Sequence, residues 1–140
     1  MSDFKRFLKA QEATHKKAIN ELANGYKISH WMWWTFPQDI SFGVSNRSIY
    51  YGLKGKVDAY NYLQNIVLKT RLEECCLTLL ALHPTHNVKS IFGALDEKKL
   101  KNSLELFASV SLDDDGELDS HSIFQRVLDR YYFSESNTDD

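Results

Sequence analysis

The chain has 140 residues, of which 43% are hydrophobic and 26% are charged, a composition typical of one soluble globular domain. No apolar run approaches the ~18 residues of a membrane-spanning helix, and the charged N-terminus lacks the apolar core of a secretory signal. We therefore expect a cytoplasmic protein that does not insert into a membrane. The formal net charge of −2 divides into −7 over residues 113–140 and +5 over the rest. The basic part can attract anionic ligands, but its charges are too scattered to predict a nucleic-acid groove.

Hydrophobic periodicity predicts a first helix over residues 3–24. Apolar side chains recur there at steps of three and four residues, which places them on one stripe of a helix. Ser2 or Asp3 is suited to cap the start of this helix, because short polar side chains bond to free backbone N–H groups. Gly25 is suited to end it, since glycine enters the left-handed conformation without a steric penalty.

Residues 27–38, which read KISHWMWWTFPQ, are the most unusual part of the sequence. All three tryptophans fall within four residues, and a histidine directly precedes them. Pro37 breaks any helix and favours an extended conformation at Phe36. We therefore predict an irregular segment, with room for one helical turn, that packs across a helical body.

Six further helices are predicted from periodicity and from capping residues. They cover residues 46–51, 56–63, 67–82, 87–92, 96–110 and 120–132. In the helix over residues 56–63 we expect Val57, Tyr60 and Leu63 to face inward, because they lie three residues apart. Asp96 is suited to cap the helix that follows it.

No alternating strand pattern of convincing length is present, so the predicted fold class is all-α. We expect a compact single-domain bundle of about five to seven helices over residues 1–133, with the Trp-rich segment packed across it. Residues 111–119 are predicted to form a polar loop, and residues 134–140 a disordered acidic tail.

Several familiar kinds of site are disfavoured. Cys75 and Cys76 are adjacent, which argues against a disulfide between them, and the leucines around them indicate two core residues. The five histidines are scattered, so no pair supports a zinc site. Residues 111–122 resemble a calcium-binding loop, but Ser122 stands where such a loop needs a bidentate glutamate. No glycine-rich phosphate loop is present either. We expect neither a metal nor a cofactor.

The best candidates for function lie in the Trp-rich segment. His30 can act as an acid or a base near neutral pH, although a histidine beside aromatic residues is also a common packed, structural residue. Trp31 and Trp33 offer flat faces to a ligand ring, and can equally fill the core between helices. Gln38 can read a ligand amide or a base edge, or can satisfy buried backbone groups in a proline turn.

The same residues resemble the signature of the domain of unknown function 1810 family. The similarity covers about residues 3–133 and is carried by Arg6-Phe7, Ala10-Gln11, Glu21-Leu22, Gly25, Lys27, Ser29-His30-Trp31-Met32-Trp33, Phe36-Pro37-Gln38 and Ile91-Phe92-Gly93. The resemblance implies a small, mainly helical fold and no known activity. Some members carry the label calpastatin, although calpain inhibitors of that name are disordered, whereas this sequence predicts helices. The sequence departs from the family at Asn65-Ile66, where a His-Pro pair is frequent.

The hypothesis that we favour is a small-molecule site for a phosphate- or nucleotide-like ligand, which is either bound or hydrolysed. His30 would be the catalytic residue and would transfer a proton, while Trp31 or Trp33 would stack on a ring. Arg71 and Lys99 would hold an anionic group such as phosphate. The other ligand-binding candidates are Lys27, Gln38, Ser45 and Tyr51.

Two other classes of function remain open. The first is a protein-interaction module in which the exposed part of the Trp-rich segment is the hot spot, because tryptophan contributes strongly to binding at interfaces. The sequence does not name the partner of such a module. The second is nucleic-acid binding through stacked tryptophans, which the scattered basic charge argues against.

Overall fold

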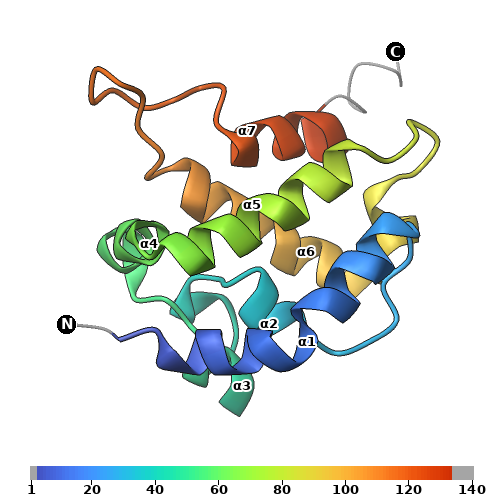
Figure 1. Cartoon of the computed structure of the whole chain (residues 1–140), viewed down its shortest axis with the longest axis horizontal. Helices are drawn as coiled ribbons and strands as arrows, with labels where there is room; N and C mark the ends of the chain where they lie inside the picture. The colour runs from blue at the N-terminus through green and yellow to red at the C-terminus, as the bar shows by residue number, and fades with distance from the viewer. Residues whose placement is uncertain (1–2, 134–140) are drawn as a thin grey trace.

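The computed structural model describes residues 3–133, which form seven α-helices and no sheet (Figure 1). This confirms the predicted all-α class. The helices are α1 (Lys5–Ala23), α2 (Met32–Thr35), α3 (Asn46–Tyr50), α4 (Gly55–Gln64), α5 (Ile66–Leu80), α6 (Val88–Ala108) and α7 (Ile123–Leu128). A 3-10 helix η1 (Ile40–Phe42) follows α2, and a π-helical turn η2 (Asp129–Phe133) continues α7. The predicted acidic tail at 134–140 lies outside the described residues.

The long first helix ends as predicted. Gly25 has a φ of +75°, and its N–H donates to the carbonyl of Leu22, so the left-handed residue closes the last turn of α1. At the other end the prediction is wrong: Phe4 occupies the N-cap position without a capping side chain, and Asp3, one residue earlier, only accepts a hydrogen bond from the backbone N–H of Lys5. Ser2, the other predicted cap, lies outside the described residues.

Helix α5 forms the centre of the molecule. It packs against α1, α4 and α7, and Figure 1 shows it running between α7 on one side and α1 on the other. Cys75 and Cys76 are buried free thiols in this helix, which confirms the prediction that they are core residues. Burial raises the pKa of both thiols, so they stay protonated and apolar near neutral pH.

The inner face of α4 differs from the prediction. Val57 is 74% exposed and Tyr60 is 43% exposed, so two of the three residues expected to face inward face solvent, while the third is buried. Asp58 and Tyr62 are buried instead. The carboxylate of Asp58 accepts a local hydrogen bond from the backbone N–H of Lys54, and the ring of Tyr62 packs against aromatic side chains of α1 and α6. In so short a helix, tertiary contacts of this kind decide which side is buried.

The two helices predicted over residues 87–92 and 96–110 are joined in α6. The helix begins at a capping box between Asn87 and Ser90, and Gly93, at φ +85°, kinks it. Asp96 does not cap a helix as predicted, because its carboxylate pairs with the ammonium groups of Lys27 and Lys99. The kink therefore leaves Asp96 available to join α6 to the segment after α1.

The polar loop over residues 111–119 is present as predicted. The carboxylate of Asp113 accepts hydrogen bonds from the backbone N–H groups of Asp115 and Glu117, so it stabilises the turn of this loop. Ser122 caps α7 by accepting a hydrogen bond from the N–H of Gln125. Within residues 3–133, no group of histidines, cysteines and carboxylates has the arrangement of a metal site. No helix of this part combines the length and the apolar character needed to cross a bilayer.

Candidate functional site

A buried carboxylate organises the start of the Trp-rich segment. Glu21, on the last turns of α1, is 6% exposed and accepts four hydrogen bonds. The donors are the N–H of Ile28 at 2.8 Å, the N–H of Ser29 at 2.9 Å, the hydroxyl of Ser29 at 2.6 Å and the indole of Trp31 at 2.9 Å. Burial alone would raise the pKa of Glu21, but these hydrogen bonds outweigh it and lower the pKa to about 2. The segment is therefore held by a permanent negative charge.

The Trp-rich segment makes one helical turn, α2, as the sequence analysis allowed. The three tryptophans face different surroundings. Trp31 is fully buried against Phe36. The indole N–H of Trp34 donates to the hydroxyl of Thr14, and its ring packs against Tyr51. These two tryptophans join α2 to the body of the protein, whereas Trp33, half-buried like Trp34, lies beside Lys99.

Two lysines share one carboxylate beside α2. The ammonium of Lys27 lies 2.8 Å from Asp96, and that of Lys99 lies 3.2 Å from the other oxygen of the same carboxylate. Burial raises the pKa of Asp96, but the two ammonium groups outweigh this effect and lower it. Lys27 also lies over the ring of Trp31, and Lys99 lies 4.4 Å from the ring centre of Trp33. Both ammonium groups are therefore fixed in position by several contacts.

A small cavity opens at this cluster. It has a volume of about 50 Å³ and brings together four residues that the sequence analysis selected. These are Lys27, His30, Trp33 and Lys99, and the lining is completed by Met32, Arg47 and Asp96. Three basic side chains face one carboxylate, so the cavity carries an excess of two positive charges before His30 is counted. The arrangement suits an anionic group.

His30 lies at the open side of this cavity. Its side chain is exposed and makes no hydrogen bond within the described residues. Its two neighbours in the chain, by contrast, are held in place, since the backbone N–H of Ser29 and the indole N–H of Trp31 both donate to the carboxylate of Glu21. The imidazole is therefore free to meet a ligand from an anchored position on the chain.

The remaining predicted site residues lie outside the cavity lining. Trp31 is behind it, in the core, and Gln38 is buried, where its amide N–H donates to the carbonyl of Phe36. Ser45 caps α3 by accepting a hydrogen bond from the N–H of Ser48. Two further residues have structural contacts. Tyr51 packs on aromatic neighbours, and Arg71 reaches the side chain of Gln11 on α1.

Three charged residues of the site were not predicted from the sequence. Arg47 belongs to the short helix α3, Asp96 was interpreted as a helix cap, and Glu21 was counted only within the family signature. The sequence does indicate a buried role for Glu21, because a carboxylate on the apolar stripe of an amphipathic helix needs buried hydrogen-bond partners. Nothing in the sequence around Arg47 indicates that it meets Lys99.

The fold and the cavity define a small all-α protein with a basic pocket beside a buried aromatic segment. The family model described as "Protein of unknown function (DUF1810)" matches residues 1–140, so the chain belongs to this family, as its signature residues indicated. Among solved structures, it is similar to the crystal structure of the conserved hypothetical protein Rv1873 from Mycobacterium tuberculosis. The two share 34% identity and a TM-score of 0.83 over 91% of this chain and 86% of that one. No curated protein matches the sequence.

Proposed function

We propose that the cavity beside α2 binds the phosphate group of a small ligand. The observation that supports this proposal is the convergence of three basic side chains, Lys27, Arg47 and Lys99, from three different parts of the chain on one cavity. Only one carboxylate, Asp96, offsets them. Arginine and lysine are the residues that hold phosphate groups most often, the former through its planar fork of donors and the latter as a point charge.

The size of the cavity matches one such group. Its volume of about 50 Å³ exceeds several times the ~10–15 Å³ that one water needs, yet is far below the ~300 Å³ of pockets that enclose a whole small molecule. The rest of the ligand would therefore lie outside, along the surface near Trp33 and His30. Because Lys99 covers one face of the Trp33 ring, a ligand ring would stack on the other face.

The proposal includes a hydrolytic version, in which His30 transfers a proton to or from the ligand. The support for this version is the placement of an exposed imidazole on an anchored backbone at the cavity. Release of inorganic phosphate from p-nitrophenyl phosphate and from nucleotides measures it directly. If hydrolysis occurs, His30→Gln should slow it by about 100- to 10,000-fold while the affinity for the ligand stays within threefold.

Binding is tested by isothermal titration calorimetry with inorganic phosphate, phenyl phosphate and nucleoside phosphates. Arg47→Ala and Lys99→Ala should each weaken binding by about tenfold or more, because each removes a charge that faces the anion. Lys98→Ala is the matched control, since Lys98 is an exposed neighbour on α6 that does not line the cavity. A ligand at 100 times its dissociation constant should also stabilise the wild-type protein by about 2.7 kcal/mol. Absence of binding for all three probes would overturn the proposal.

A protein partner is the second candidate, favoured by exposed apolar side chains on the same segment. Tyr26 is 62% exposed and Ile28 is 71% exposed, and the two residues flank Lys27 in the chain. Large apolar side chains of this kind contribute to binding when a partner covers them. A double variant, Tyr26→Ser with Ile28→Ser, should then lose a complex that the wild-type protein forms, while Arg47→Ala should keep it. If the double variant keeps the complex, this surface is not its interface.

A further inference from the structure

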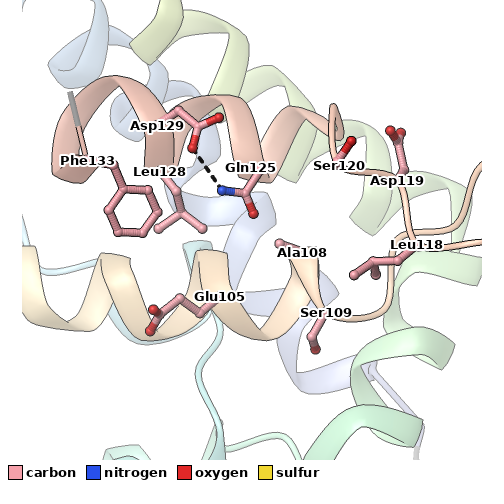
Figure 2. Close-up of a pocket in the computed structure, with 10 residues that line it drawn as sticks. All are labelled: Glu105, Ala108, Ser109, Leu118, Asp119, Ser120, Gln125, Leu128, Asp129 and Phe133. Atoms are coloured by element: carbon pink, nitrogen blue, oxygen red, sulfur yellow. Dashed lines mark hydrogen bonds between the residues drawn. The ribbon is translucent and has the colours of Figure 1, made fainter.

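A second concave site lies away from the Trp-rich segment. It is a cleft of about 460 Å³ between α6 and the α7–η2 segment (Figure 2). Leu128 and Phe133 project from α7 and η2 toward α6, and Leu118 closes one end from the polar loop, as Figure 2 shows. Its volume falls within the ~300–1,000 Å³ range of pockets that bind small molecules.

Four apolar side chains form much of the surface of the cleft. Leu128 and Ala108 are buried beneath it, while Leu118 is 59% exposed and Phe133 is 42% exposed. Two large apolar side chains that remain open to solvent beside a concave floor can bury further area against a ligand with an apolar body.

The polar groups of the cleft are mostly acceptors, and its charged groups are all acidic. Glu105, Asp119 and Asp129 line it, and no basic side chain does. None of these carboxylates forms an ion pair with another part of residues 3–133. Two of them accept a hydrogen bond from neutral donors: Asp129 from the amide of Gln125 (Figure 2), and Asp119 from a backbone N–H. The chain around these residues strengthens the negative field, since residues 113–133 hold six acidic and two basic side chains.

We propose that this cleft binds a small organic cation that has an apolar body and one ammonium group. The apolar body would lie against Leu118, Leu128 and Phe133, and the ammonium group would donate charge-assisted hydrogen bonds to carboxylates at the edge. The charge of the cleft is opposite to that of the cavity beside α2, so the two sites would select different ligands.

Calorimetric titration with 4-phenylbutylammonium, compared with the neutral 4-phenylbutan-1-ol, tests the proposal on the full chain. The two probes share the same apolar body and differ in charge. The ammonium probe should bind at least tenfold more tightly, and its affinity should fall as salt is raised, because screening weakens exposed charge pairs. Equal affinity for the two probes, or no binding of either, would overturn the proposal.

Three variants locate the binding site. Glu105→Gln and Asp129→Asn should each weaken binding of the ammonium probe by about fivefold and leave the alcohol unchanged. Leu118→Ala should weaken both probes, and its exposed position makes it compatible with folding. Asp114→Asn is the matched control, because it removes the same charge from an exposed position that does not line the cleft. If Asp114→Asn weakens binding as much as the two cleft variants, the ammonium probe responds only to net charge and the proposal fails.

A lysine-containing peptide is the remaining arm of the test. Binding of the peptide without binding of the free ammonium probe would assign the cleft to a protein partner and overturn the small-molecule proposal. Binding of the ammonium probe with a dissociation constant at least tenfold below that of the peptide would support it.

Discussion

The basic cavity beside α2 and the acidic cleft beside α7 share one helix but are built differently. Asp96 and Lys99, from the middle of α6, line the first, while Glu105 and Ala108, from its end, line the second. The cavity is about 50 Å³ and the cleft about 460 Å³. Lysines at the cavity are held by an ion pair and by aromatic rings, whereas the carboxylates of the cleft are open to solvent.

The comparison shows that the larger of the two sites is not the one whose side chains are held more firmly in position. In the cavity, the lining side chains rest on a buried layer formed by Glu21 and Trp31. Such support fixes positions in advance and lowers the cost of ordering them on binding. The cleft is larger, but fewer contacts hold its charged side chains in position. The affinity of a ligand there would therefore depend more on the apolar area that it buries and on the salt concentration.

Removal of the buried layer should have the largest effect. Trp31→Ala deletes a fully buried side chain, so it should lower the free energy of unfolding by about 3–5 kcal/mol, measured by urea denaturation. Trp33→Ala is the matched control, because Trp33 is half-buried at the cavity and should cost clearly less. Equal losses for the two variants would show that the cavity side and the core side of α2 are not distinct.

The charge of Glu21 should have the next largest effect, and it should depend on pH. Because folding lowers its pKa from an ordinary 4.5 to about 2, this group adds stability above pH 4.5 and loses it as the pH falls toward 2. The contribution is roughly 2–3 kcal/mol when fully present. Glu21→Gln should lower stability at pH 7 and should flatten the curve between pH 5 and pH 2, measured by denaturation at each pH. A wild-type curve that is as flat as that of the variant would contradict the assigned role.

Asp96 offers a smaller and more selective test of the basic cavity. Asp96→Asn removes the one carboxylate that competes with an anionic ligand, so the affinity for phosphate should rise by about threefold to tenfold. The same variant should leave binding of 4-phenylbutylammonium at the cleft unchanged. A fall in phosphate affinity would mean that Asp96 serves mainly to position the two lysines.

The smallest effect should be that of a substitution at one site on the affinity of the other site, because we expect the two sites not to be coupled. Arg47→Ala should change the affinity of the ammonium probe by less than twofold, and Glu105→Gln should change that of phosphate by equally little, at 0.15 M salt. The two residues share no contact and lie on different elements. Calorimetry on both variants with both probes measures this. A larger cross-effect would indicate that α6 transmits a change between the sites.

Much of the fold was predictable because it depends on local chemistry. Gly25 closes α1 with a positive φ, and Ser45 caps α3, since each acts on backbone groups only a few residues away. The buried side of α4 was not predictable in this way. Val57 and Tyr60 have the apolar character of inward residues, yet they face solvent, because the neighbouring Tyr62 packs its ring against aromatic side chains of α1 and α6.

The residues of the candidate site also fall into two groups, those that the sequence predicts and those that only packing brings together. The concentration of Lys27, His30 and Trp33 in one segment was visible in the sequence, because neighbouring residues stay together in any fold. Arg47 and Asp96 were not, since they come from separate helices and meet this segment only through packing. Arg71 has the positive charge of a residue that binds phosphate, but its place on α5 brings it to the side chain of Gln11 on α1.

By itself, the sequence determined the all-α class, the family, the glycine that ends α1 and the place of the aromatic segment, because these follow from local backbone preferences and from residue order. Only the tertiary structure decided which charges face one another. Ion pairs and cavities depend on how helices far apart in the sequence pack, and the pairing of Asp96 on α6 with Lys27 is one example. Packing also decided that Trp31 is buried, whereas Trp33, two residues further along the chain, is only half-buried.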